Sequence, residues 1–174
     1  MLEMPVHFFD TNALVKAYIY EPGSPWVNGV MAVKIPPPHI YISELARIEV
    51  LSTLYKIERV RGYSSAFTDS AVNMFKRDLR LSMPTRRYRI YELVPLSDAV
   101  LTLAGTLLQK YRTGTPYALR SLDAIQLASA QLARSSLPSA EQADMTFVTV
   151  DRQLRGAAGA EGFQPINPEH PPST

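Results

Sequence analysis

The stretch VHFFDTN, residues 6–12, decides the fold, because it changes from mainly apolar to polar within a single step. Residues 6–9 form a short apolar run, which is typical of a buried strand. Polar residues follow at once, and Asp, Thr and Asn are favoured where a helix begins. The stretch therefore predicts a strand that ends at the start of a helix.

Strand-like and helix-like segments alternate along the rest of the chain. β-Branched and aromatic runs predict strands at His39–Ile42, Arg89–Val94, Thr146–Val150 and Phe163–Ile166. Apolar spacing, capping residues and Gly or Pro breaks predict helices at Ala13–Ile19, Ser24–Val33, Ser43–Val60, Ser64–Leu81, Asp98–Tyr111, Leu119–Arg134 and Gln153–Ala160. Strands separated by helices require a parallel sheet covered on both faces. We therefore expect an α/β three-layer sandwich with a parallel sheet of four to five strands.

The size and composition indicate one globular domain. The chain has 174 residues, of which 46% are hydrophobic and 20% charged, and it has no cysteine. We expect a single domain over residues 1–166 and a disordered, Pro-rich tail over residues 167–174. The lack of cysteine excludes disulfides, thiolate metal ligands and a cysteine nucleophile. No secretory signal precedes residue 6 and no apolar run is long enough to cross a membrane, so we expect a cytoplasmic protein.

The charge is unevenly distributed, although the net charge is only +2. The segment KRDLRLSMPTRRYR, residues 76–89, contains six basic residues and a single acid, Asp78. Such an excess could pair with the phosphates of a nucleic acid. A solvated helix face followed by a turn explains the pattern equally well.

Two acids stand directly after predicted strands. Asp10 follows residues 6–9, and Asp151 follows Thr146–Val150. In open parallel sheets, functional sites form outside the carboxyl ends of the strands. We therefore expect both carboxylates at one edge of the sheet, although each could serve only as a helix N-cap.

Asp123 lies on a helix that is apolar nearly all round. Leu119, Leu127 and Ala130 are its neighbours at helical spacing. A carboxylate on such a surface needs a hydrogen bond, a counter-charge or a metal ion. The alternative is an acid that is favoured in the first helical turn, with Ser121 as the cap.

Glu49 is less distinctive than the three aspartates. It shares a helix face with Ser52 and Lys56, so spacing alone favours a solvated surface glutamate. Glu44 and Glu58 lie on the same predicted helix and compete with it.

Four segments in order carry a family resemblance: FFDTNALVKAYIYEPGS, ISELARIEVLSTL, LRSLDAIQLASA and FVTVDRQLRGAA. Together they resemble the PIN-domain family, and within it the VapC-type toxins of prokaryotic toxin–antitoxin pairs. The resemblance implies a PIN-like fold and a catalytic set made of Asp10, Glu49, Asp123 and Asp151. It also implies supporting roles for Thr11, Asn12 and Thr149, a homodimer built on Ser43–Leu81, and an antitoxin that covers the acidic site.

The chemistry of four acids agrees with that resemblance. Two carboxylates about 5 Å apart repel by about 3 kcal/mol at an effective dielectric constant of about 20. A divalent cation removes the conflict, and oxygen ligands suit Mg²⁺ or Mn²⁺. We therefore expect a metal-dependent endoribonuclease with Asp10, Asp123 and Asp151 as metal ligands.

More than one interpretation remains open for the residues that contact the substrate and for the class of function. Arg120 and Arg152, beside the acids, and Arg86 and Arg87, in the basic segment, are candidates for binding RNA phosphates; the first two could equally pair with surface carboxylates. A non-catalytic PIN-like module that binds RNA or protein is the second hypothesis. A phosphatase that uses Asp10 is the third, although Asn12 stands where that chemistry usually has a second acid. The sequence has no paired-histidine metal motif and no nucleotide-binding glycine loop.

Overall fold

A computed structural model describes residues 5–33, 38–82, 89–113 and 116–172. Its centre is a fully parallel five-stranded sheet of order β3-β2-β1-β4-β5. The strands are β1 (Val6–Phe9), β2 (His39–Ser43), β3 (Glu92–Val94), β4 (Thr146–Val148) and β5 (Gln164–Ile166). The predicted parallel α/β sheet is therefore confirmed, with β1 in the middle position.

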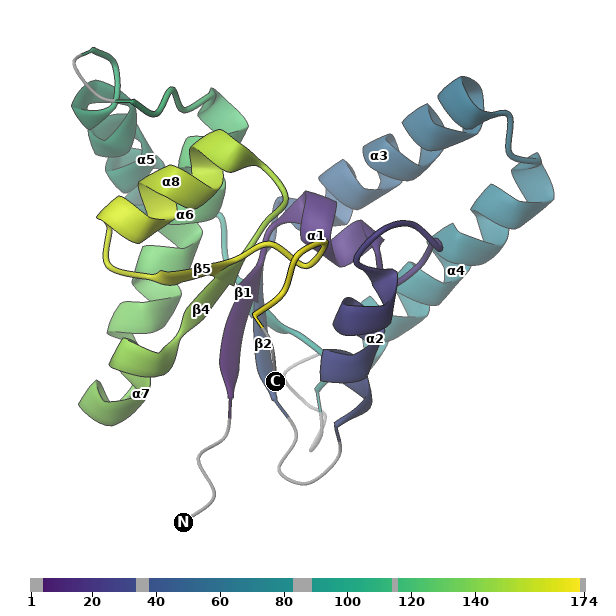
Figure 1. Cartoon of the computed structure of the whole chain (residues 1–174), viewed down its shortest axis with the longest axis horizontal. Helices are drawn as coiled ribbons and strands as arrows, with labels where there is room; N and C mark the ends of the chain where they lie inside the picture. Colours follow the sequence, from purple (N-terminus) through teal and green to yellow (C-terminus); the bar gives the residue numbers. More distant parts are fainter. Residues whose placement is uncertain (1–4, 34–37, 83–88, 114–115, 173–174) are drawn as a thin grey trace.

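Helices cover both faces of this sheet (Figure 1). They are α1 (Thr11–Val15), α2 (Ser24–Ala32), α3 (Ala46–Arg61), α4 (Ser65–Leu81), α5 (Asp98–Lys110), α6 (Ser121–Ser135), α7 (Ser139–Asp144) and α8 (Arg152–Ala160). The first four lie on one side and the last four on the other, which gives the predicted three-layer sandwich.

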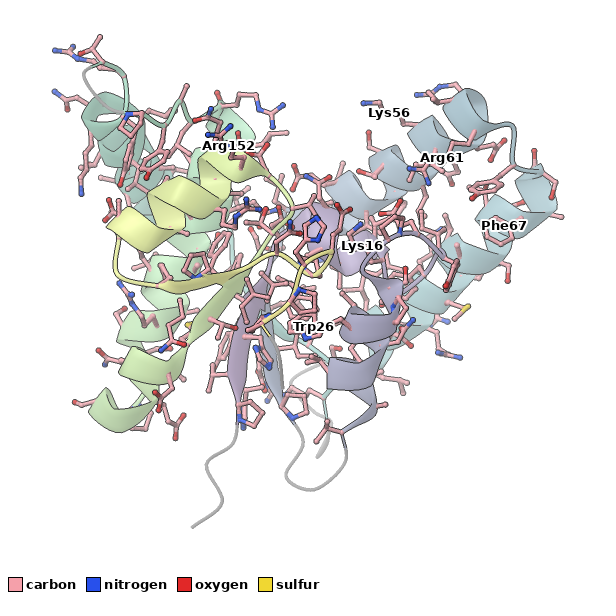
Figure 2. The ribbon with its side chains drawn as sticks, in the orientation of Figure 1. Lys16, Trp26, Lys56, Arg61, Phe67 and Arg152 are labelled. Carbon is pink, nitrogen blue, oxygen red and sulfur yellow. The ribbon has the colours of Figure 1, made fainter. Side chains whose placement is uncertain are left out.

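Side-chain alternation along the central strands divides the core in two. Phe8 and Phe147 stack at a ring distance of 5.3 Å and belong to the core under α5, α6 and α8. Phe9 and Val148 point to the other face and pack with α1, α2 and α3. Trp26 of α2 stacks over Phe9 with ring centroids 6.4 Å apart (Figure 2). The buried, central β1 therefore holds the residue that follows it, Asp10, in a fixed position.

Several helix boundaries differ from those expected. Ser43 ends β2 instead of capping the next helix, because its hydroxyl is used in contacts with Ser129 and the Leu45 amide. The helix after β1 stops at Val15, and α7 is an addition that the sequence pattern did not reveal.

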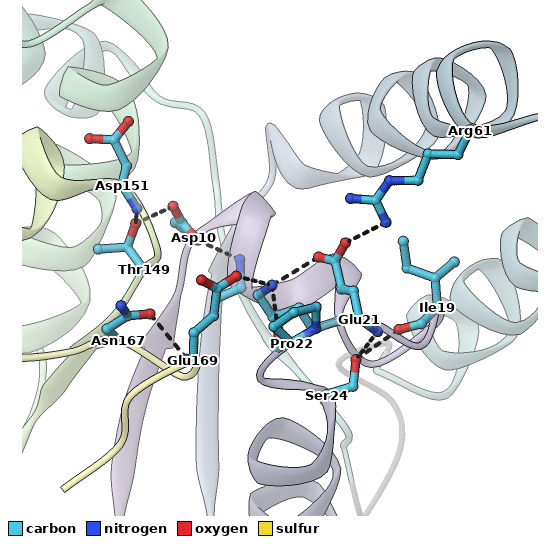
Figure 3. Close-up of polar contacts among 12 residues, drawn as sticks. Asp10, Ile19, Glu21, Pro22, Ser24, Arg61, Thr149, Asp151, Asn167 and Glu169 are labelled. Atoms are coloured by element: carbon cyan, nitrogen blue, oxygen red, sulfur yellow. Dashed lines mark hydrogen bonds and ion pairs between the residues drawn. The ribbon is translucent and has the colours of Figure 1, made fainter.

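Residues 167–170, after β5, make defined contacts, in part of the segment 167–174 that we expected to be a disordered tail. Pro168 is buried, and the Glu169 carboxylate lies 2.9 Å from Lys16 Nζ (Figure 3). Lys16 is itself only 2% exposed and also pairs with Glu21 at 2.9 Å. A buried ammonium needs such partners, so these contacts fix the segment against α1.

Within the described residues, every helix falls short of the length and apolar character that crossing a membrane requires.

Candidate active site

The four predicted acids reach one edge of the sheet from four separate segments. Asp10 precedes α1, Asp151 precedes α8, and Glu49 and Asp123 lie in the first turns of α3 and α6. Hydrogen bonds and electrostatic contacts join them into one network. The parallel order of β1 and β4 brings the two strand-end acids together, as the sequence predicted.

Asp10 is the most buried of the four, with 2% of its surface exposed. Its Oδ1 accepts a hydrogen bond from the Ala13 amide at 2.7 Å, so it does cap α1. Its Oδ2 accepts one from the Thr149 hydroxyl at 2.6 Å. Burial raises the pKa of Asp10 from 3.8 to about 7. The two hydrogen bonds lower this pKa, while the negative charges of Glu49 and Asp123 raise it further.

Thr149 connects the two strand-end acids. Its hydroxyl donates to Asp10 and accepts from the Asp151 amide at 3.0 Å (Figure 3). It is fully buried, so its hydroxyl oxygen is held in place on both sides. This geometry agrees with the supporting role that the resemblance implied for Thr149.

Glu49 is half-buried and is held by two donors that meet at one of its oxygens. The Thr11 hydroxyl donates to Glu49 Oε2 at 2.7 Å, and Gln126 Nε2 donates to the same oxygen at 2.6 Å. Glu49 is therefore part of the acidic network, whereas helical spacing alone favoured a solvated residue.

Gln126 is the residue that the sequence analysis missed. It lies three residues after Asp123 on α6 and is 3% exposed. A signal was present, since it is an amide on a helix stretch whose other buried side chains are mostly Ala and Leu. Without its partner on α3, that signal did not indicate a role.

Asp123 and Asp151 share one cation, Arg120. The Arg120 guanidinium lies 2.9 Å from Asp123 Oδ2 and 3.2 Å from Asp151 Oδ2. Both acids also hold helix starts: Asp123 accepts from the Arg120 amide, and Asp151 accepts from the Gln153 and Leu154 amides. Arg120, and not Ser121, is the N-cap residue of α6. Asp123 and Asp151 therefore each cap a helix and belong to the acidic network at the same time.

A cavity of about 520 Å³ opens beside Glu49. Its walls come from α1, α3 and the start of α6: Thr11, Asn12, Glu49, Ser52, Thr53, Lys56, Arg120, Ser121, Leu122 and Asp123. Asn12 is exposed at its rim, and Lys56 and Arg120 supply positive charge there. Arg152 is exposed at the start of α8 (Figure 2), while Arg86 and Arg87 lie outside the described residues.

A comparison with family models shows to which family this fold belongs. The family model described as "PIN domain" matches residues 7–160. The chain belongs to the PIN-domain family. The resemblance drawn from the four sequence segments is thereby confirmed, and the matched range includes all four acids of the candidate site.

One of two similar solved structures agrees with this PIN-domain assignment at the level of the fold. A chain of a "toxin-antitoxin complex from Klebsiella pneumoniae" superposes with a TM-score of 0.56 at 20% identity, covering 93% of this chain and 97% of that one. A chain of VapBC2 from Rickettsia felis, bound to a promoter DNA fragment, gives a TM-score of 0.48 at 19% identity, covering 84% and 87%. No curated protein sequence matches the chain.

The PIN-domain acids fit a hard divalent cation by their chemistry. All four are carboxylates, and Asp10 is subject to repulsion from Glu49 and Asp123. Within the described part of the chain, no group of three or more Asp, Glu or His side chains is already arranged as a metal site. Arg120 explains part of this, because its guanidinium takes up carboxylate oxygens of Asp123 and Asp151. A cation at these oxygens would require the exposed Arg120 side chain to move.

Proposed function

We propose that this protein is a Mg²⁺- or Mn²⁺-dependent endoribonuclease of the VapC type. The observation that carries the proposal is Asp10, a buried carboxylate whose pKa burial raises to about 7 and which two further acids repel. A carboxylate so placed lowers the stability of the fold, and such costs are typical of functional sites. PIN-domain membership selects nuclease chemistry among the reactions that an acidic site could perform.

Asp10, Asp123 and Asp151 are the residues that would hold the metal ion, with Glu49 as the fourth acid. When bound, the cation supplies Lewis-acid polarisation of the phosphodiester and lowers the pKa of water.

The protein's own residues orient and hold this site. Thr149 and the Ala13 amide fix both oxygens of Asp10. The hydrogen bonds from Thr11 and Gln126 to Glu49 both end on Oε2, so neither occupies Oε1, and Glu49 lines the cavity. A carboxylate oxygen of this kind accepts a proton from an attacking water. Lys56 and Arg120, at the cavity wall, are suited to hold RNA phosphates.

The proposal includes two protein partners. The similar structure from Klebsiella pneumoniae is a toxin–antitoxin complex, which supports an antitoxin as one of them. A second copy of the chain is the other, and exposed apolar side chains on α3 and α4 support it: Ile48 is 70% exposed, Val60 73% and Phe67 43%. Light scattering during size-exclusion chromatography measures the dimer directly.

The central experiment is RNA cleavage by the purified protein with Mg²⁺, with Mn²⁺ or with EDTA. We expect cleavage that requires the metal and that falls by about a hundred-fold or more in Asp10→Asn, because several kcal/mol of charge stabilisation are lost. Asp98→Asn is the matched control, since Asp98 is an exposed acid at the start of α5.

Four results would count against the mechanism. Equal cleavage by Asp10→Asn, or cleavage in EDTA, contradicts the role of the acids. RNA binding without turnover favours the non-catalytic module, and release of phosphate from a small phosphomonoester without RNA cleavage favours the phosphatase.

A further inference from the structure

Gln126 makes an unusual set of contacts for a buried amide. Its Nε2 donates to Glu49 Oε2 at 2.6 Å and to Thr11 Oγ1 at 3.0 Å. Its Oε1 is buried and has no hydrogen-bond partner among the described residues. The side chain therefore directs its amide nitrogen toward the acidic site and leaves its acceptor unsatisfied.

The network fixes which way the amide points. Thr11 donates its single hydroxyl hydrogen to Glu49, so its oxygen is an acceptor toward Gln126. If the amide were turned over, its oxygen would face the Glu49 carboxylate at hydrogen-bond distance and repel it. Only the orientation with Nε2 toward Glu49 satisfies both neighbours.

This arrangement is poor for stability alone. A buried acceptor without a partner is rare in folded proteins and costs free energy. The other buried side chains of α6 are mostly apolar, among them Ala124, Leu127, Ala128 and Ala130, so a buried amide is an exception on this helix. The amide is therefore better explained by what its donors do for Glu49 than by its contribution to the core.

We propose that Gln126 is a positioning residue for Glu49. Its Nε2, together with the Thr11 hydroxyl, holds Glu49 Oε2 so that Oε1 stays presented to the cavity. The inference rests on the proposed nuclease function, since it assigns Gln126 a part in that reaction through Glu49.

The test compares one substitution at two glutamines of the same helix. Gln126→Met keeps an unbranched side chain but removes the donors and the unsatisfied acceptor. Gln131→Met is the matched control: Gln131 also donates to a glutamate, Glu161 Oε2 at 2.8 Å, but it lies five residues further along α6. We expect Gln126→Met to lower the RNA cleavage rate roughly 10- to 100-fold, as loss of an orienting partner usually does, while its melting temperature stays at or above that of the wild type. Gln131→Met should cleave at the wild-type rate.

A double-mutant cycle separates positioning from a general structural effect. If Gln126 acts through Glu49, adding Gln126→Met to Glu49→Ala costs nothing further in cleavage rate. Gln126→Glu serves as the second variant, because it keeps the shape and replaces the donor by a carboxylate; it should lose as much activity as Gln126→Met. Wild-type cleavage by both variants, an additive loss in the cycle, or an equal loss in Gln131→Met would overturn the proposal.

A spectroscopic measurement keeps this result distinct from a failure of the nuclease proposal. In ¹⁵N NMR spectra, we expect one Gln126 side-chain amide proton to be shifted downfield and to exchange slowly with solvent, and to lose that shift in Glu49→Ala. Wild-type protein that shows this signature but cleaves no RNA would refute the nuclease and leave the Gln126–Glu49 contact in place. A Gln126 signal unchanged by Glu49→Ala would refute the contact itself.

Discussion

The acidic site has two halves that are stabilised in different ways. In the Asp10–Glu49 half, Asp10 is 2% exposed and neutral groups donate to the carboxylates: hydroxyls of Thr11 and Thr149, an amide side chain and a backbone amide. In the Asp123–Asp151 half, the side chains are 14% and 24% exposed and share the guanidinium of Arg120.

The difference shows where the site opposes stability. In the Asp123–Asp151 half, solvent and the Arg120 guanidinium offset the negative charge of the two carboxylates, which also cap two helices. The Asp10–Glu49 half has hydrogen bonds but no cationic partner within the described residues, and burial raises the pKa of Asp10 to about 7. A metal ion would therefore mainly reduce the electrostatic repulsion and the burial cost in the Asp10–Glu49 half. Three predictions test this contrast, from the largest expected effect to the smallest.

The largest effect concerns the pH dependence of folding through Asp10. Its pKa is raised from 3.8 to about 7, so between these values the carboxyl is protonated in the folded chain and ionised in the unfolded chain. Stability should therefore fall as pH rises through this window, by up to about 4 kcal/mol at pH values above it. Asp10→Asn removes the titration and should be more stable than the wild type at about pH 8. Urea unfolding in EDTA across the pH range measures both effects.

Asp98→Asn controls for the loss of an acid at a helix start. It should follow the wild-type pH profile, because Asp98 is exposed. Parallel curves for the wild type and Asp10→Asn would show that the Asp10–Glu49 half does not oppose folding.

A smaller effect is expected from Thr149→Val, which keeps the shape of the side chain. It removes the buried hydroxyl between Asp10 and the Asp151 amide, and a hydrogen bond to a charged group contributes about 1.5–3 kcal/mol. We expect a destabilisation of that size at about pH 8, where Asp10 is ionised, and a smaller one at about pH 5. An equal loss of stability at both pH values would mean that the stabilisation by the Thr149 hydroxyl does not depend on the charge of Asp10.

The smallest effect on stability is expected from Arg120→Ala. The Arg120 side chain is 73% exposed, and such ion pairs contribute about 0–1 kcal/mol, less at high salt. The same change should tighten Mn²⁺ binding, measured by electron paramagnetic resonance, because Asp123 and Asp151 lose a competing cation. Arg47→Ala, which removes the exposed pair with Glu44, is the control and should leave Mn²⁺ binding unchanged. Weaker binding in Arg120→Ala would contradict the competition.

The sequence was informative wherever the signal is local. The apolar run before Asp10 and the β-branched run before Asp151 predicted two strands, and those strands lie next to each other in the sheet. Helical spacing indicated that Asp123 lies on a buried helix, and α6 is largely buried. Glu49 was selected only by the family resemblance, because its own helix face looks polar.

Contacts between distant segments could not be obtained in this way. Gln126 and Glu49 are 77 positions apart, Thr149 and Asp10 are 139 apart, and Glu169 reaches Lys16 across 153 positions. Each partner is an ordinary polar residue in its local sequence, and its role depends on which side chain lies opposite.

By itself, therefore, the sequence determined the alternation of strands and helices, the parallel sheet and the two acids at its edge, because periodicity and strand ends are written into neighbouring residues. Only the tertiary structure decided how the acids are held: neutral donors around Asp10 and Glu49, and a shared arginine between Asp123 and Asp151. The physical reason is that hydrogen bonds and burial depend on distances in space, which the packing of α3, α6 and α8 around the strand ends sets.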